Sequence, residues 1–381
     1  MDFTRSEAEI EVSQLAASIL AAAATDASFS TDFDAGLWKD LAQAGLLSLA
    51  LPADVGGDEL GVQATAAVLT EVGRCAARVP ALATLALGVL PVARSADSAL
   101  KQRLLAGVAA GETVLTAAIR EPSDPMPTAP RTVAAATSGG QPATLTGLKT
   151  GVPYAAAANW ILVPASVGTP DARARTVVAV IAPDADGLSC QRTRSSSGLP
   201  EYTLRLENTP AAHLLDGCDA DGLYRIAVAG ACAVADGVLA AALDLTTEHV
   251  RSREQFGRPL ATFQAVAQQI ADVYATARTL HLATLSACWQ LDTSRDAGRD
   301  TDVAAFWLAE HGPRAMRTCH HLHGGLGMDI TYPLPRYSAL LTDLVALVGG
   351  ADDRLERLSW REQDPLEQDP LELSSTEAAD A

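Results

Sequence analysis

GLYRIAVAGACAVADGVLAAALDLTTEHVRSR, residues 222–253, is a stretch of small and apolar residues that is compatible with one uninterrupted helix. Alanine destabilises a helix least and lets neighbouring backbones approach closely. A helix over these residues would be about 45 Å long. The buried stripe of a second long helix is marked by Phe263, Val266, Ile270, Val273, Ala277 and Leu280. Long helices with small residues indicate a bundle that forms oligomers.

The sequence upstream of this bundle contains two further segments, each with its own pattern of apolar residues. FDAGLWKDLAQAGLLSLALP, residues 33–52, has apolar residues three and four apart, and prolines and glycines then break the pattern, so a helical first part is predicted. Short β-rich runs such as TVLTAAI, ATLTG, WILVPA, TVVAVIA and YTLRLE follow, separated by Pro, Gly, Ser and Asp. They have no helices between them and no G-x-G-x-x-G motif after them, which disfavours a parallel dinucleotide-binding sheet.

The predicted architecture is therefore mainly helical with a central β domain. Its parts are an N-terminal helical domain over residues 1–111, a middle β domain over 112–216 and a C-terminal helical bundle over 217–360. Residues 361–381 are acidic, contain a short duplication and two prolines, and are predicted to form a disordered tail.

Composition restricts the possible partners. The 381 residues carry a formal net charge of −18, and no run of Lys and Arg offsets it, which excludes nucleic acid as a partner. The six cysteines are scattered without a C-x-x-C pair, as is typical of reduced thiols in the cytoplasm. The start lacks the layout of a signal peptide, and polar residues interrupt every long apolar stretch, so no membrane segment is expected.

The stretch HHLHGGLGMD, residues 320–329, is open to three interpretations. A metal site is disfavoured because no two of its three histidines stand four residues apart, the spacing that converges imidazoles on one helix face. A helix end is the second interpretation, since Gly324 and Gly325 stop a helix and histidine is favoured near its negative end. In the third, the glycines let the backbone approach and donate amide hydrogens to a phosphate or a ring edge.

A second candidate site precedes it, in RSREQFGRPLATFQAVAQQIAD, residues 251–272. Arg253 stands ahead of Phe256 and Gly257, an arrangement that suits a bidentate grip on a pyrophosphate with an aromatic ring packed beside it. Alternatively, Arg251 and Arg253 only complement the negative end of the preceding helix.

Together the two stretches resemble a known pair. REQFGRPLATFQAVAQQIAD, residues 253–272, and HLHGGLGMDITYPLPRY, residues 321–337, look like the paired signature of the acyl-CoA dehydrogenase family. LWKDLAQAGLLSLALPADVGG, residues 37–57, resembles the family's first domain. The resemblance implies the family's fold, with a β-barrel-like middle domain and a C-terminal four-helix bundle, and a tetramer whose FAD lies between two subunits.

The resemblance also implies the cofactor contacts. In the family, one subunit holds the flavin ring and the acyl thioester, and its dimer neighbour holds the adenosine diphosphate half of the FAD. The contacts that this chain would lend across the dimer are Arg253, Phe256, Gln264, His321, Leu322, Gly324 and Gly325. His321 stands where the family usually has glutamine, which keeps a hydrogen-bonding side chain at that place.

The catalytic base is where the sequence departs from the family. The family's glutamate takes the proton next to the thioester carbonyl while hydride leaves for the flavin, so a carboxylate is required. Its two usual positions align with Val348 and Tyr224. Valine cannot take a proton, and a tyrosine pKa would have to fall by roughly three units, which takes about 4 kcal/mol. The displaced carboxylates that could substitute are Asp221, Asp352 and Asp353.

The segments that hold the flavin ring have also changed. The family pattern Glu-Pro-Gly-x-Gly-Ser-Asp becomes REPSDPMP at residues 120–127, which keeps Glu121 and Pro122 but loses the glycines. The Trp-Ile-Thr triplet aligns with residues 151–153, where Pro153 offers neither a hydroxyl nor an amide hydrogen. Trp160 is retained and anchors this alignment.

These losses follow the role of each residue. The groups that would hold the chain's own flavin ring and substrate are missing, whereas the groups that it would lend to a neighbouring subunit remain. The pattern is similar to the non-catalytic partner in actinobacterial heterotetrameric acyl-CoA dehydrogenases that act on steroid side-chain CoA thioesters. It implies a catalytic partner subunit, an acyl-CoA substrate in the complex and a separate flavoprotein as electron acceptor. Two alternatives stay open: a self-sufficient flavoenzyme that uses Tyr224 or a displaced aspartate, and a flavin-free scaffold or acyl-CoA-binding protein.

Overall fold

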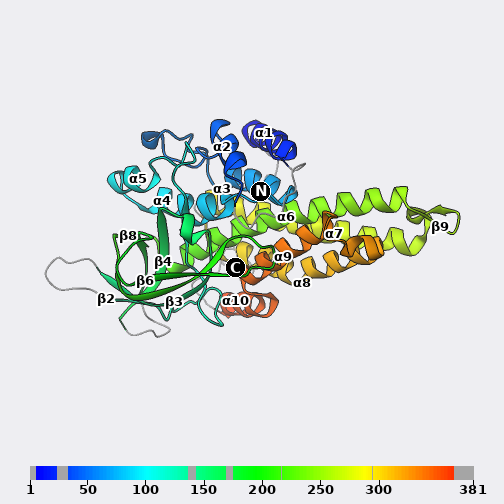
Figure 1. The fold of residues 1–381 in the computed structure, drawn as a ribbon. Coiled ribbons are helices and arrows are strands. Elements are labelled where there is room, and N and C mark those ends of the chain that lie inside the picture. Colours follow the sequence, from blue (N-terminus) through cyan, green and yellow to red (C-terminus); the bar gives the residue numbers. More distant parts are fainter. Residues whose placement is uncertain are drawn as a thin grey trace, which may run out of the picture.

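A computed structural model describes residues 6–23, 33–135, 143–168, 175–215, 217–293 and 295–363. Helices, a β sheet and a second, longer set of helices follow one another along the chain (Figure 1). This confirms the predicted order of a helical N-terminal domain, a central β domain and a C-terminal helical bundle. The last helix, α10 (Ala351–Gln363), runs past the predicted start of the tail, and the rest of that tail lies outside the described residues.

The N-terminal part consists of short helices. Side chains fix where two of them begin, because Asp34 accepts a hydrogen bond from the Leu37 amide (2.9 Å) and Asp97 accepts one from the Leu100 amide (2.8 Å). The elements are α1 (Glu7–Ala23), α2 (Ala35–Gln43), η1 (Ala53–Val55), α3 (Val62–Arg74), the π-helical η2 (Leu82–Val89), α4 (Leu90–Ser95) and α5 (Ser98–Leu105).

The central domain is one mixed sheet with the strand order β6-β7-β3-β2-β4-β5-β8, and β1 pairs with β4. The pairs β1–β4 and β2–β4 are parallel and the other pairs are antiparallel. Its elements are β1 (Leu115–Ala117), β2 (Val133–Ala135), β3 (Thr144–Pro153), η3 (Ala155–Ala157), β4 (Trp160–Val167), β5 (Thr176–Ile181), β6 (Leu188–Thr193), β7 (Glu201–Pro210) and β8 (His213–Leu215). Among the described residues of this sheet, no α-helix stands between strands, as the sequence predicted, and η3 is a single three-residue turn of 3-10 helix.

The C-terminal part is built on long helices that extend away from the sheet (Figure 1). The 33-residue helix α6 begins where Asp219 accepts a hydrogen bond from the Gly222 amide at 2.8 Å. The elements are α6 (Ala220–Ser252), β9 (Glu254–Gln255), β10 (Arg258–Pro259), η4 (Leu260–Thr262), α7 (Gln264–Asp292), α8 (Gly298–His323), η5 (Gly324–Met328), α9 (Leu334–Val348) and α10.

Two glycines bring the N-terminal and C-terminal helices into backbone contact. A Cβ atom at Gly237 of α6 would lie 1.8 Å from the Thr70 carbonyl oxygen of α3, and one at Gly73 of α3 would lie 1.9 Å from the Val234 carbonyl oxygen of α6. The two helices can lie this close only because both positions lack a side chain. α6 is long and apolar enough to cross a membrane, yet 89% of its most apolar window is buried inside the protein, as expected of a core helix.

Gly237→Ala tests this helix contact. The added methyl group has no space, so α3 and α6 must move apart, and we expect unfolding free energy to fall by about 1–3 kcal/mol. Chemical denaturation of the full chain measures the change. Gly325→Ala is the control, because its Cβ would meet no atom within 4 Å. Equal stability of the two variants would contradict this account of the packing.

Candidate functional site

The C-terminal end of α6 carries the first group of candidate residues. β9 and β10 form a hairpin whose turn residues, Phe256 (φ 56°) and Gly257 (φ 76°), both have positive φ, as a two-residue type I′ turn requires. The turn holds Phe256 at 92% exposure at the outer end of the long helices (Figure 1). Arg253 caps α6 and is exposed, and among the described residues its guanidinium makes no ion pair. Gln264, the first residue of α7, is exposed as well.

The C-terminal end of α8 carries the second group. The helix stops at His323, and the Gly324 amide (φ 58°) donates to the carbonyls of His320 and His321. This confirms the helix-end interpretation of the histidine stretch. His321, Gly324 and Gly325 are exposed, and Leu322 is buried. A Cβ atom on either glycine would meet nothing within 4 Å, so the backbone there is open to a ligand.

The structure brings these two groups to the same end of the bundle. The rings of His249 on α6 and His323 on α8 stack with their centroids 4.4 Å apart. Arg253 follows His249 by one turn, and Gly324 follows His323 directly. An arginine, an aromatic ring and two glycines with open space around their Cα atoms therefore lie at the same end of the bundle, a combination that suits a diphosphate group.

The two positions expected for a catalytic base are deeply buried. Tyr224 is 3% exposed, and its hydroxyl has no hydrogen-bond partner among the described residues. Burial raises the pKa of this hydroxyl well above its usual range, the opposite of what a base near neutral pH needs. Val348 is fully buried at the end of α9.

A buried arginine fills the space beside Val348. Arg354 of α10 is 2% exposed, and its Nε donates to the Val348 carbonyl oxygen at 2.5 Å. Its Nη1 donates to Asp302 of α8 at 2.8 Å, and its Nη2 lies 2.9 Å from the Met126 sulfur. Met126 belongs to the loop that replaces the family's glycine-rich segment, so this loop packs directly against the end of α9.

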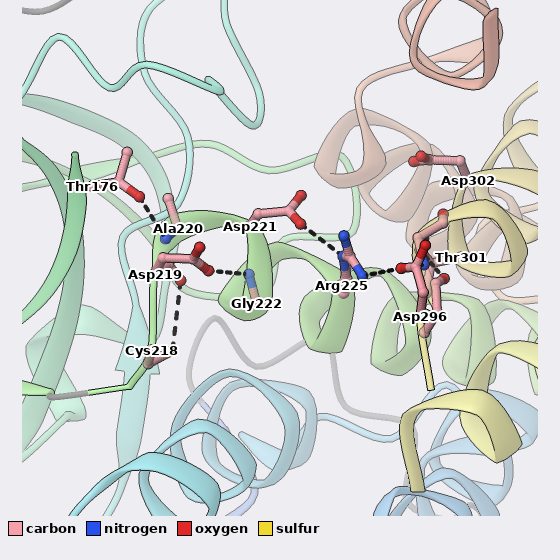
Figure 2. Close-up of polar contacts among 12 residues, drawn as sticks. Thr176, Cys218, Asp219, Ala220, Asp221, Gly222, Arg225, Asp296, Thr301 and Asp302 are labelled. Atoms are coloured by element: carbon pink, nitrogen blue, oxygen red, sulfur yellow. Dashed lines mark hydrogen bonds and ion pairs between the residues drawn. The ribbon is translucent and has the colours of Figure 1, made fainter. Parts of the chain in front are cut away.

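The displaced carboxylates are engaged or turned to solvent. Figure 2 shows Asp221 turned toward Arg225, whose Nε donates to it at 2.7 Å, and the same guanidinium also contacts Asp296. Asp353 accepts a hydrogen bond from Arg357 Nε at 3.0 Å. Asp352 is exposed near the start of α10. The oxygens of Asp221 and Asp353 are thus already bonded to arginines of the same chain.

Glu121, which the sequence retains, is turned into the β domain. It is 3% exposed and its Oε1 lies 2.8 Å from Nζ of the fully buried Lys149. Burial alone would raise the pKa of Glu121, but the charge and hydrogen bond of Lys149 and the bonds from Thr132 hold it below its usual range. Burial lowers the pKa of Lys149 to about 8. The ion pair of Glu121 and Lys149 holds the loop after Glu121 against β3, so Glu121 has a structural role in this chain.

A small cavity remains where the sheet meets the helices. Its volume is about 100 Å³, and it lies between η2, α6, α9 and the ends of β3 and β7. Tyr154 (φ 53°, 4% exposed) lines it, with its ring packed edge-on against Phe33. Gly151 lies against Arg120, whose Nη1 would be 2.4 Å from a Cβ there. Pockets for drug-sized ligands measure roughly 300–1,000 Å³, so this cavity is smaller than such a pocket.

The candidate residues at the ends of α6 and α8 are mostly exposed, whereas Tyr224 and Val348 are buried. Sequence reasoning missed the groups around Val348, Arg354, Asp302 and Met126, and it missed the His249–His323 stack. Each of these contacts joins segments far apart in the sequence, so no local signal marked them. Among the described residues, no cluster of three His, Cys, Asp or Glu side chains could hold a metal ion.

Comparisons with known proteins agree with this architecture. Residues 6–112 match the acyl-CoA dehydrogenase N-terminal domain, and residues 223–355 match the acyl-CoA dehydrogenase C-terminal domain. Acyl-CoA dehydrogenase FadE28 of Mycobacterium tuberculosis is 43% identical over 326 residues, which is 85% of this chain and 91% of that protein.

Two solved structures are also similar. A chain of the ChsE4-ChsE5 complex from Mycobacterium tuberculosis is 32% identical with a TM-score of 0.87, and the match covers 96% of this chain and 100% of that one. A chain of a variant of the Tcur3481-Tcur3483 steroid ACAD is 32% identical with a TM-score of 0.85, covering 92% and 96% of the two chains.

Arg354→Met tests the buried ion pair beside Val348. The substitution removes the guanidinium charge that pairs with the buried Asp302 carboxylate, so we expect a loss of about 3–5 kcal/mol in unfolding free energy. The double variant Arg354→Met with Asp302→Leu should recover most of that loss. Arg314→Met is the control, since its exposed pair with Glu310 on the surface of α8 contributes less than about 1 kcal/mol. An Arg354→Met chain as stable as the control would refute the role of this pair.

Proposed function

The chain belongs to the acyl-CoA dehydrogenase family, and we propose that it is the accessory subunit of a heteromeric, FAD-dependent member of that family. The enzyme would introduce a double bond next to the carbonyl of an acyl-CoA thioester. FAD, the cofactor implied by this membership, would supply the oxidising group for this reaction when bound. The residues of this chain would hold part of the cofactor, and a partner subunit would supply the catalytic glutamate.

The observation that carries this proposal is the closure of the chain's own reacting position. A base must reach the substrate proton within about 2.6–3.2 Å, directly or through one water. The two aligned positions hold a buried valine and a buried tyrosine of raised pKa. Arg354 and Met126 occupy the space beside Val348, and the cavity near residues 151–153, about 100 Å³, is below the range of pockets for drug-sized ligands.

The residues proposed to hold the cofactor lie at the opposite, open end of the bundle. Arg253 would pair with the diphosphate, and the backbone at Gly324 and Gly325 would approach it closely. Phe256 would pack beside the adenosine diphosphate half. The remaining proposed contacts, carried over from the family by position, are Gln264, His321 and Leu322.

Exposed apolar side chains near this end support an oligomer. Phe256 (92%), Met328 (76%) and Ile330 (65%) are exposed on the hairpin and on the segment that follows α8. Exposed apolar groups that gather on one surface commonly mark an interface with another protein. A partner subunit whose own flavin ring lies at this end would cover these apolar side chains.

The partner and substrate follow from the relatives. The two similar structures are named as a complex of two different chains and as a steroid ACAD. We therefore propose a heterotetramer with a catalytic acyl-CoA dehydrogenase-like subunit that acts on a steroid side-chain CoA thioester in β-oxidation. We further propose a cytoplasmic location and a separate flavoprotein as electron acceptor. Burial of Tyr224 argues against a self-sufficient enzyme, because the pKa of its hydroxyl is shifted in the wrong direction.

Arg253→Ala in the purified complex tests the cofactor contact. Loss of a charged hydrogen bond removes about 1.5–3 kcal/mol, so the dissociation constant for FAD should rise by roughly 10- to 100-fold. Flavin absorbance after dialysis measures the retained cofactor. Arg205→Ala, an exposed arginine of β7, is the control. The isolated chain should carry no flavin and show no turnover, and a yellow, active preparation of this chain alone would defeat the proposal.

Tyr224→Phe separates the accessory subunit from a self-sufficient enzyme. Because the hydroxyl has no partner among the described residues, its removal should leave stability unchanged or slightly higher. Turnover of the complex should stay within about twofold, a free-energy change smaller than 1 kcal/mol. A steady-state assay with an acyl-CoA substrate measures the turnover. Abolished turnover in a folded variant would favour Tyr224 as the base.

A further inference from the structure

Two stacked imidazoles join the ends of α6 and α8. The rings of His249 and His323 have their centroids 4.4 Å apart and are inclined by 20°. His323 is 5% exposed, and its ring also contacts that of Tyr332, with the centroids 5.3 Å apart. Both rings therefore contact His323 at the point where α8 ends.

The hydrogen bonds of His323 fit its neutral form. Nδ1 lies 2.8 Å from the Cys319 carbonyl oxygen, which can only accept, so Nδ1 carries the proton. Nε2 lies 3.1 Å from the Tyr332 hydroxyl, which can donate to it. Both ring nitrogens are thus satisfied without a positive charge, and the ring is held in one orientation.

The stack lies between the two groups proposed to hold FAD. The Arg253 amide donates to the His249 carbonyl oxygen at 2.8 Å, so His249 is directly linked to the residue that caps α6. Gly324 follows His323 and begins the open backbone of η5. The distance between the arginine and the glycines therefore depends on how α6 and α8 are held together at these two rings.

The charged groups around the stack oppose protonation. Burial lowers the pKa of His249, and His323 and Arg253 lower it further. Burial also lowers the pKa of His323, the Cys319 carbonyl partly offsets this, and His320 lowers it again. Two protonated rings at this separation would repel each other. The other charged groups on neighbouring segments are Arg258 on β10, Asp329 before Tyr332 and Arg336 on α9.

We propose that His249 and His323 are positioning residues that hold the proposed FAD contacts together while both rings are neutral and release them when either ring is protonated. This inference rests on the proposed function. It assigns the pair no contact with the reacting atoms. It makes FAD retention by the complex sensitive to acid.

The sign of the effect follows from linkage. A histidine whose pKa is lower in the folded chain binds fewer protons than in the unfolded chain, so the folded arrangement loses stability as pH falls below the ordinary value of about 6.5. The loss is complete once pH passes the lowered pKa. One linked proton changes the FAD dissociation constant by at most about tenfold per pH unit.

A titration of the full chain tests the stack without any cofactor. The chain has seven histidines, and each gives one Cε1–H resonance. We expect those of His249 and His323 to titrate below the ordinary range in the unaltered chain, as should that of His213, because burial lowers its pKa as well. In His323→Phe, which keeps a flat ring in the stack, the resonance of His249 should move back toward pKa 6.5. Ordinary titration of both histidines in the unaltered chain would overturn the inference.

FAD release from the complex tests the link to the cofactor. Flavin fluorescence in the filtrate, measured from pH 8 to pH 5, should show a dissociation constant that rises up to tenfold per pH unit once the pH falls below the lowered pKa of the pair in the FAD-free chain. His249→Phe and His323→Phe should each flatten this rise, and thermal unfolding at pH 8 verifies that they are folded. His311→Phe is the control, because its ring stacks on Trp307 elsewhere on α8.

The outcomes separate this inference from the proposed function. Undiminished FAD retention by Arg253→Ala at pH 8 would contradict the proposed function. If Arg253→Ala weakens FAD retention at pH 8, the proposed function stands. The role of the histidine pair alone would then be overturned if FAD release is independent of pH, or if both phenylalanine variants keep the pH slope. A pH slope that disappears in both variants and persists in His311→Phe supports it.

Discussion

A single guanidinium is held almost completely out of water where α8, α9 and α10 meet. Arg354 pairs with Asp302 and donates to the carbonyl of Val348, and its third contact is the sulfur of Met126. Taking two charges out of water is unfavourable by several kcal/mol for each ion, so this pair persists only because every partner is in place. Its position ties the loop after Glu121 to the end of α9. The space beside Val348 is thereby occupied.

The region around Arg354, where the sheet meets the helices, is buried, and we call it the closed side. The ends of α6 and α8 are exposed, and we call them the open side. On the closed side, the sheet and the helices meet around a cavity of about 100 Å³, and Tyr224 lies buried with a raised pKa. On the open side, α6 and α8 end together at the histidine stack, and the hairpin and the glycines face solvent. A chain built in this way can lend binding groups to a neighbour without forming a complete site of its own.

The sequence predicted the helices and strands, but it predicted none of the contacts that Arg354 makes. The many alanines of residues 222–253 predict the long helix, because alanine destabilises a helix least, and the structure shows that Gly237 lets this helix lie against α3. Gly324 and Gly325 predict the end of α8, because positive φ favours glycine. The pair of Arg354 and Asp302 spans 52 residues and depends on how three helices pack, which no local pattern encodes. The family resemblance indicated that a base was missing at Val348, but not which side chains take its place.

The ratio of FAD to polypeptide in the native complex tests the central claim most directly. Flavin is released by denaturation and measured by absorbance, and the two kinds of chain are quantified by amino-acid analysis. If this chain contributes only the diphosphate side of the site, the complex holds one FAD for each pair of unlike chains. One FAD for every chain would contradict the account, because the ring position of this chain would then be in use.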